Sequence, residues 1–434
     1  MTLNRKWNWA ACGLTAALLL LAACVPVATP LPSPLPSPTA AETLPPPTAT
    51  VAAGPLVTTL TLWLPAEFNP YGDEPGAALL AQQLDSFNQA HPELQVAAIV
   101  KKARGRGGLL DFLRTASAAA PSVMPDLVIL EMEDLRVAAQ AGLLQPLDGF
   151  LPDSLVADRY PFAVSLGRVD ERTMGIVIAA DMTHMAYDPA LLSSPPVSWT
   201  AAISMGMPLL FPAGGQDGSV NDATLLQYAA AGGRWLDEAG NPLLEAGPLE
   251  AVLSFYGRAA EAGVISPTLL LSLADNDACW EQFRRGGAAM TAVSSRRFWA
   301  TGERSALPAP FPTPDGRLVA LAQGRWALAL VTADAERQQQ AMQLAEWLLV
   351  SGQYGLWTQS TAYLPTSQSG LAAWEVSAQE RAALDAMLQA AQPMPPAAVR
   401  SAVGPPLQAA LEAVLTGQRS PAEAAAEAAR AVRP

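Results

Sequence analysis

The sequence predicts an α/β fold built on a parallel sheet with helices on both faces. Short apolar segments with strand character at 57–64, 94–100 and 126–130 alternate with segments in which apolar residues recur at helical spacing. A helix after each strand supplies the long connection that parallel strands need. Since 50% of the side chains are hydrophobic and 15% are charged, the 434 residues can bury a large core.

The first strand and the first helix follow from simple periodicity. Leucines alternate with other residues from Leu60 onward, which is typical of a strand. The apolar residues at helical spacing that predict the first helix are Ala77, Leu80, Ala81, Leu84 and Phe87. His91 and Pro92 are expected to end this helix before the second strand.

A second and a third helix are expected around the third strand. Leu109, Leu113 and Ala116 recur at helical spacing, and Pro125 breaks the pattern before the strand. Asp134 is predicted to cap the third helix over 135–141, with Gly142 at its carboxyl end.

The second half of the chain is less regular, and its elements are predicted mainly from capping residues. The tail is expected to be mostly helical from about residue 378 onward. The predicted elements are a helix capped by Ser198, a helix over 277–285, a strand over 288–293, and helices opened by capping boxes at Ser377 with Glu380 and at Ser420 with Glu423.

Charge and rare residue types exclude several classes of function. Lys and Arg number 26 against 39 Asp and Glu, a formal net charge of −13, so a nucleic-acid partner is not expected. Two His and three Cys are too few for the usual zinc or disulfide frameworks, and we expect no metal and no cofactor. Cys279 is expected to be a buried free thiol in a helix.

The amino terminus predicts export and a lipid anchor. Residues 1–23 contain two cations, an apolar run and then small residues, as a secretory signal peptide does. The sequence that ends at Cys24 resembles the bacterial lipobox, which makes Cys24 the predicted lipidation site. Residues 24–55 hold ten of the 39 prolines, so we expect a disordered, extended tether before a folded body at 56–434.

Chemically active side chains cluster where the three predicted strands end. Ligands of parallel sheets bind beyond the carboxyl ends of the strands. The loops after Leu64, Val100 and Leu130 therefore form the first candidate site. These loops and strand ends supply aromatic, acidic and basic groups, namely Trp63, Glu67, Phe68, Tyr71, Arg104, Arg106, Glu131 and Glu133.

Several short motifs follow one another in a recognisable order over residues 57–433. They are Leu62-Trp63, Phe87 to Glu93, Pro125 to Val128, Gly142 to Asp148, Tyr187-Asp188 with Pro196 and Trp199, Phe283 to Met290, and Tyr363 to Thr366. Their order and spacing, behind a lipobox, resemble the extracellular solute-binding proteins of carbohydrate-type ABC importers, the family that includes maltose-binding protein.

The resemblance implies a two-lobed periplasmic-binding-protein-like fold that closes on its ligand by a hinge motion. One lobe would be about 56–165 with 308–350, and the other about 166–307 with 351–434. It implies a monomer that captures a solute, a sugar or a sugar derivative, and delivers it to the transmembrane subunits of an ABC permease. With the predicted anchor, the protein would be held at the outer face of the cell membrane.

The resemblance also implies where ligand contacts lie. Sugar recognition needs aromatic faces against the rings and planar acids or amides for the hydroxyls. Together with the strand-end groups, the expected ligand-binding residues are Trp63, Glu67, Glu131, Glu133, Asp181, Asn221, Asp222, Ser295, Arg296 and Trp299.

Two departures from the family pattern leave the ligand open. Gly404 and Leu130 stand near positions where maltodextrin binders carry aromatic residues, so a smaller sugar, a polyol or a non-sugar solute would also fit. One alternative function is a sensor lipoprotein that presents its ligand to a receptor. The other is a carbohydrate-active enzyme with Glu131 and Asp181 as an acid/base pair, although no nucleophile motif is visible.

Overall fold

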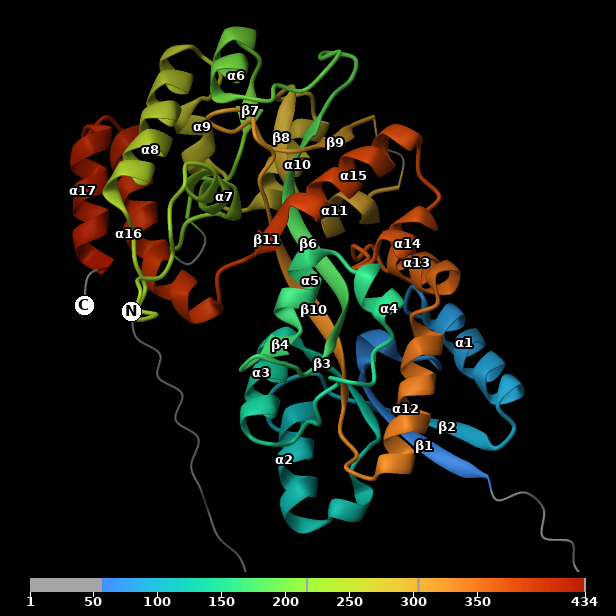
Figure 1. The fold of residues 1–434 in the computed structure, drawn as a ribbon. Coiled ribbons are helices and arrows are strands. Elements are labelled where there is room, and N and C mark those ends of the chain that lie inside the picture. Colours follow the sequence, from blue (N-terminus) through green and yellow to red (C-terminus); the bar gives the residue numbers. More distant parts are fainter. Residues whose placement is uncertain (1–56, 216–217, 303–304, 433–434) are drawn as a thin grey trace, which may run out of the picture. The chain divides into compact units, whose positions relative to one another are not determined.

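A nine-stranded sheet runs through the protein in the computed structural model, which describes residues 57–215, 218–302 and 305–432. The strands are β1 (Thr58–Pro65), β2 (Leu94–Lys101), β3 (Leu127–Glu131), β6 (Ile176–Tyr187), β7 (Leu209–Leu210), β8 (Met290–Ser294), β9 (Leu307–Ala309), β10 (Ala320–Leu330) and β11 (Ala391–Pro393). Their order is β2-β1-β3-β10-β6-β8-β7, with β11 beside β10 and β9 beside β6 (Figure 1). A separate ribbon pairs β4 (Arg168–Val169) with β5 (Arg172–Thr173). The predicted signal peptide, Cys24 and the tether lie outside the described residues.

The helices are mostly short. They are α1 (Ala77–Ala90), α2 (Leu109–Ala119), α3 (Met132–Gln140), α4 (Asp153–Ala157), α5 (Pro161–Leu166), α6 (Trp199–Met205), α7 (Asp222–Ala230), α8 (Ala246–Glu261), α9 (Pro267–Ser272), α10 (Asn276–Arg284), α11 (Ser295–Ala300), α12 (Ala335–Leu348), α13 (Ser351–Ser360), α14 (Gln368–Ala372), α15 (Ala378–Ala390), α16 (Ala397–Leu415) and α17 (Pro421–Val432), with 3₁₀ turns η1 (Ala66–Phe68) and η2 (Pro121–Val123). Within the described ranges, no helix combines the length and apolar character needed to cross a membrane.

The predicted parallel arrangement of the first three strands is confirmed, and the next two pairings across the sheet, whose direction the sequence did not predict, are antiparallel. β1 pairs in parallel with both β2 and β3. β10 then runs antiparallel to β3, and β6 runs antiparallel to β10. The sheet is therefore mixed, because the strands contributed by the second half of the chain enter it in the opposite direction.

Helices cover both faces of the first part of the sheet, as predicted. Leu62 and Leu64 of β1 pack in a core with α1, α12 and α13, which we call the first core. Trp63, one residue apart and therefore on the other face, packs with α2 and α3. This alternation along β1 explains why the leucine pattern of the sequence marked the strand so clearly.

β6 passes from the first core into a second one. Ile176 and Ile178 belong to the first core, whereas Met185 to Tyr187 belong to a second core formed with β8, α8, α10 and α16. The division into lobes stays a prediction, but residues 354–363, which the resemblance assigned to the second lobe, contribute Tyr354, Trp357 and Tyr363 to the first core.

Most predicted caps are confirmed. The side chain of Ser198 accepts from Ala201 N, and both capping boxes, at Ser377 and at Ser420, are formed. The predicted cap at Asp134 is wrong, because α3 begins at Met132 directly after β3. Asp134 instead lies in the first turn, where a carboxylate is favoured by the helix dipole.

Cys279 is fully buried in α10 and has a free thiol, as predicted. Burial and the nearby Asp275 raise the pKa of this thiol to about 12. The group therefore stays protonated and behaves as a small apolar side chain.

A buried carboxylate joins three elements of the first part of the sheet. Asp126, just before β3, accepts from Thr61 N of β1 at 2.7 Å and from Arg337 Nε of α12 at 2.7 Å. Arg337 Nη2 also donates to Thr59 O at 2.8 Å. The Asp126 side chain is 3% exposed and that of Arg337 is 36% exposed, so the acid depends on this arginine for its neutralisation.

Replacing Asp126 with alanine should destabilise the protein strongly. The change removes the buried acceptor of Arg337 and of the Thr61 amide. We therefore expect the free energy of unfolding to fall by about 3 kcal/mol. Urea denaturation measures it, with Asp315→Ala as the control. Asp315 pairs with Arg317 at 2.6 Å on the surface, and its loss should leave the midpoint nearly unchanged. Equal midpoints for the two variants would contradict the assigned role of Asp126.

Candidate functional site

β6 and β10 run side by side (Figure 1), and the candidate site is built around this pair of strands. Gln323 of β10 lies opposite Asp181 of β6, and Gly324 lies opposite Ala180. The register then shifts, so that Arg325 has no partner in β6. Such a bulge reorients a side chain away from the regular sheet face.

A pocket of about 520 Å³ lies beside this bulge. One wall is the junction of β3 with α3, including Glu131 and Glu133. A second wall is residues 322–325 of β10, and a third is residues 394–400 at the start of α16. The volume falls within the range of roughly 300–1,000 Å³ that is usual for small-molecule sites.

Glu131 forms an ion pair at the edge of the pocket. Its carboxylate pairs with Arg104 Nη2, from the loop after β2. Burial raises the pKa of Glu131, and the guanidinium of Arg104 opposes this shift. The structure therefore brings together two strand-end residues that sequence analysis placed at one sheet edge.

Asp181 lies deeper, on β6. Its Oδ1 accepts from Met182 N at 2.9 Å and from Arg296 N of α11 at 3.1 Å. Desolvation raises the pKa of Asp181 to about 6, although both backbone bonds and Arg325 favour the ionised form. Asp222 adds to the upward shift, so the two acids are close enough to interact.

Asp222 stands in a short chain of polar contacts. Asn276 Nδ2 donates to Thr183 Oγ1 at 3.1 Å, and Thr183 Oγ1 donates to Asp222 Oδ2 at 3.3 Å. Burial raises the pKa of Asp222, and Arg400 opposes this. Asn221, the preceding residue, caps α7 by accepting from Thr224 N at 2.8 Å.

α16 is held close to the loop that carries these residues. Val220 N donates to Gly404 O at 3.3 Å, and a Cβ on Gly404 would lie 2.1 Å from Ser219 Oγ. The absence of a side chain at Gly404 thus permits the helix to approach. The approach places Arg400, one turn earlier, within the electrostatic reach of Asp222.

Buried polar atoms without hydrogen-bond partners concentrate in this region. Among the described residues they include Asn221 Nδ2, Asn276 Oδ1, Ser295 Oγ and Arg400 Nε. Ser295 is the first residue of α11 and is fully buried. A buried polar atom left unpaired costs about 1 to 3 kcal/mol, so an arrangement of four such atoms favours a bound polar molecule.

Not every predicted residue contributes to this region. Trp63 is 4% exposed and packs against Phe112, with Lys101 Nζ 4.3 Å from its ring centre. It offers no free ring face, and Glu67 is exposed on η1. Of the ten predicted ligand-binding residues, only Glu131 and Glu133 line the pocket.

The segment at α11 combines structural and exposed groups. Trp299 is half-buried and packs edge-to-face on Trp374 at 5.2 Å. The guanidinium of Arg296 lies over the ring of Tyr363 at 4.5 Å, while its backbone amide binds Asp181. Of the two, Arg296 is the one that the structure ties directly to the acids.

Sequence analysis missed Gln323, Arg325, Arg400, Thr183 and Asn276. Gly324 inside an apolar strand was a readable signal, since an isolated glycine there often marks a bulge. Pro395 and Pro396 similarly indicate that a helix begins directly after them. Nothing in the sequence, however, showed that these distant segments meet.

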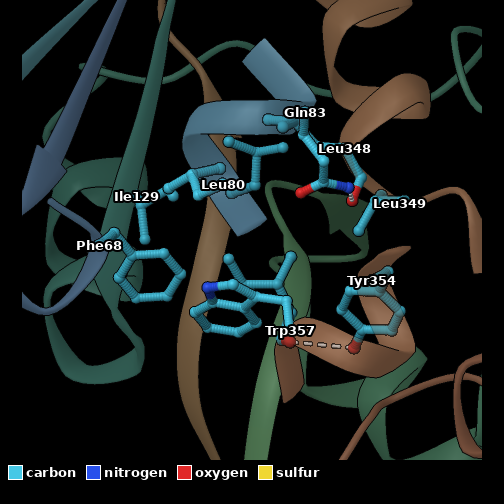
Figure 2. A pocket seen from close by; sticks show the side chains of 10 residues that line it. Phe68, Leu80, Gln83, Ile129, Leu348, Leu349, Tyr354 and Trp357 are labelled. Atoms are coloured by element: carbon cyan, nitrogen blue, oxygen red, sulfur yellow. Dashed lines mark hydrogen bonds between the residues drawn. The ribbon is translucent and has the colours of Figure 1, made fainter. Parts of the chain in front are cut away.

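A second cavity lies in the first core and does not fit a polar solute. It measures about 30 Å³ and is lined by apolar side chains that include Phe68, Leu80 and Trp357 (Figure 2). A void of this size holds no more than about one or two water-sized probes. It is a packing defect of the core.

The sequence profile of bacterial extracellular solute-binding proteins matches residues 82–384, which is more than half of the chain. No curated protein sequence matches it.

Solved structures share the fold at low sequence identity. A family 1 extracellular solute-binding protein from Alicyclobacillus acidocaldarius aligns with a TM-score of 0.68 at 18% identity, over 86% of this chain and 97% of the other. The sugar-binding protein MalE from Xanthomonas citri gives 0.66 at 18%, over 86% and 96%. The cyclic α-maltosyl-1,6-maltose binding protein from Arthrobacter globiformis gives 0.65 at 19%, over 87% and 98%. The predicted two-lobed α/β fold is thereby confirmed.

Asp181→Asn should change how stability depends on pH. Between about pH 4 and pH 6 the folded protein keeps a proton on Asp181 that the unfolded chain, with an ordinary pKa of 3.8, has lost. The stability contributed by this group therefore falls as pH rises through that window. Relative to wild type, the variant should gain about 1 to 3 kcal/mol from pH 4 to pH 7.

The paired comparison is needed because His184 acts in the opposite direction. Burial lowers the pKa of His184 to about 4, so its contribution to stability rises over nearly the same pH range. Urea unfolding of wild type and variant at several pH values isolates Asp181. A difference in unfolding free energy that is constant with pH would rule out the raised pKa.

Proposed function

Because the chain belongs to the family of bacterial extracellular solute-binding proteins, we propose that it captures a sugar or a sugar derivative in the pocket beside β10 and delivers it to an ABC importer. In this proposal the acids hold the solute by hydrogen bonds and perform no chemistry on it.

The observation that carries the proposal is a group of unpaired buried polar atoms close to Asp181 and Asp222, the two acids that interact through space with the pocket-lining Arg325 and Arg400. Asn221 directly precedes Asp222, and Asn276 reaches Asp222 through Thr183. Ser295 directly precedes Arg296, whose amide binds Asp181. Carboxylates accept hydrogen bonds, and amides and hydroxyls both donate and accept them. A polyhydroxylated solute offers donors and acceptors on every side, which suits such a mixed set.

The geometry also supports binding coupled to a change of conformation. One wall of the pocket comes from β3 and α3, which pack together with Trp63 of β1. Another wall comes from α16, which packs in the second core. A solute that touches both walls binds more tightly when they approach. It would shift the population toward a closed form by that difference in affinity.

The compartment and the partner are the remaining parts of the proposal. We propose that Cys24 carries a lipid anchor at the outer face of the cell membrane and that residues 24–55 tether the folded body to it. The permease subunits of an importer would receive the solute from the closed form. We further propose that the protein acts as a monomer.

Ser295→Ala is the sharpest single test of the proposed site. Ser295 Oγ has no hydrogen-bond partner among the described residues, so its loss should leave the stability of the free protein unchanged or higher by about 1 kcal/mol. Solute affinity should fall by about fivefold to a hundredfold. A thermal-shift screen of sugars on wild type first supplies the solute, since a ligand at about 100 times its Kd adds about 2.7 kcal/mol.

The matched control is Ser198→Ala, which removes the cap of α6 at a residue that does not line the pocket. It should cost about 1 kcal/mol of stability and leave affinity unchanged. Unaltered affinity in Ser295→Ala would remove Ser295 from the site, and a screen with no sugar hit would refute sugar capture.

Cys24→Ser should release the protein from membranes. Expressed in a bacterial host, the wild type should incorporate an alkyne-labelled fatty acid and sediment with the membrane fraction, because its cysteine is acylated. The serine variant should do neither. Labelling that persists in the variant would show that the anchor, if any, lies elsewhere.

A further inference from the structure

The pocket collects positive charge on a chain that is acidic as a whole. The formal net charge is −13, yet four arginines line the pocket, Arg104, Arg136, Arg325 and Arg400, against two acids, Glu131 and Glu133. Residues 101–106, Lys-Lys-Ala-Arg-Gly-Arg, contain the only lysines after Lys6 and end beside this pocket through Arg104. A locally positive concavity concentrates anions even on an acidic protein.

Three of these arginines have no direct acidic partner among the described residues; Arg136 is exposed, whereas Arg325 and Arg400 are half-buried. Arg104 is neutralised by Glu131, but within the described residues neither Arg325 nor Arg400 forms a salt bridge or a side-chain hydrogen bond. Arg325 interacts through space with Glu131 and Asp181. Arg400 interacts in the same way with Asp222. The N–H groups of such a half-buried guanidinium have no acceptor in the described part of the chain and can therefore donate hydrogen bonds to a ligand.

The start of α16 adds to the positive potential. This helix has 19 residues, no side-chain cap at Pro396 and no acidic residue in its first turn. Ala397, Ala398 and Arg400 all line the pocket. A cation near a helix amino terminus is disfavoured by the helix dipole, and Asp222 attracts Arg400 only through space, so a bound anion would further stabilise Arg400 at this position.

The bulge in β10 explains how Arg325 reaches the same pocket. Arg325 is the bulged residue and has no partner in β6. The alternation of side chains between the two sheet faces is therefore interrupted at this position. Both arginines and the uncapped helix end thus belong to one concavity.

We propose that the solute carries an oxyanion, a carboxylate or a phosphate, and that Arg325, Arg400 and the amino end of α16 bind it. This inference rests on the proposed function and narrows it to acidic sugars, such as uronic acids and sugar phosphates. The planar guanidinium matches either oxyanion with two parallel hydrogen bonds. Asp222, Asn276 and Ser295 would then bind the hydroxyls of the same molecule.

The test compares acidic sugars with their neutral counterparts by isothermal titration calorimetry on the purified protein. The probes are glucuronate, galacturonate and glucose 6-phosphate, each paired with glucose or galactose. At least one acidic probe should bind tenfold or more tightly than its neutral partner, and its affinity should weaken as salt is raised. A preference for the uronates or for the phosphate identifies which oxyanion the site takes.

Arg400→Gln and Arg325→Gln should each lower the affinity of the protein for the acidic probe by about tenfold to a hundredfold. Affinity for the neutral sugar should change little. Arg430→Gln, on the exposed surface of α17, removes the same charge elsewhere and should have no effect. Circular dichroism and the Tm of each variant check that it folds, and Arg400→Lys should recover part of the affinity.

Binding of neutral sugars alone would overturn this inference and leave the proposed function standing. No binding of any probe would count against both. Tight binding of an acidic probe that neither arginine variant weakens would also overturn the assignment of the oxyanion site.

Discussion

β6 and β10 are paired with each other along most of their length, and nearly every other part of the molecule depends on that pairing. β10 links the pair to the parallel strands through β3, and β6 links it to β8 and β9. Where the two strands are paired, apolar side chains such as Ala180 and Ala322 pack in a smaller cluster with Phe162 and Trp374, between the first and second cores. Polar residues such as Asp181 and Arg325 can therefore occupy a position that would be apolar in a uniform sheet.

The position of the site at these paired strands also determines how much free energy its polar groups cost. Four unpaired polar atoms and two acids with raised pKa values make the empty site unfavourable, while interactions such as Asp126 with Arg337 stabilise the surrounding sheet. Unsatisfied groups held in place by a rigid frame lose little further entropy when a ligand arrives. Under the proposed function, pairing these polar groups with the solute would add to the affinity of the protein.

Local patterns predicted much of this fold and little of this site. The alternating leucines of β1, the spacing in α1 and α2 and the capping serines were all readable, because each depends on residues within one or two turns. The antiparallel entry of β6 and β10 was not, since no local signal specifies which distant strands pair. Glu131 and Asp181 were predicted from strand ends and a resemblance, whereas Arg325 and Arg400 needed the bulge and the helix start to be seen together. Trp63, also predicted from a strand end, packs against Phe112 and Lys101, since an aromatic at such a position can pack into a core as readily as face a ligand.

The contact at Gly404 bears on how the specificity of such a protein can evolve. A ring at this position would have to displace Ser219 and the amide of Val220, which are held next to Asn221 and Asp222. A single substitution toward an aromatic platform would therefore disturb the acid and amide groups of the site at the same time. In the proposed site, divergence to new solutes is more accessible through Arg325 and Arg400, which line the pocket and form no salt bridge among the described residues.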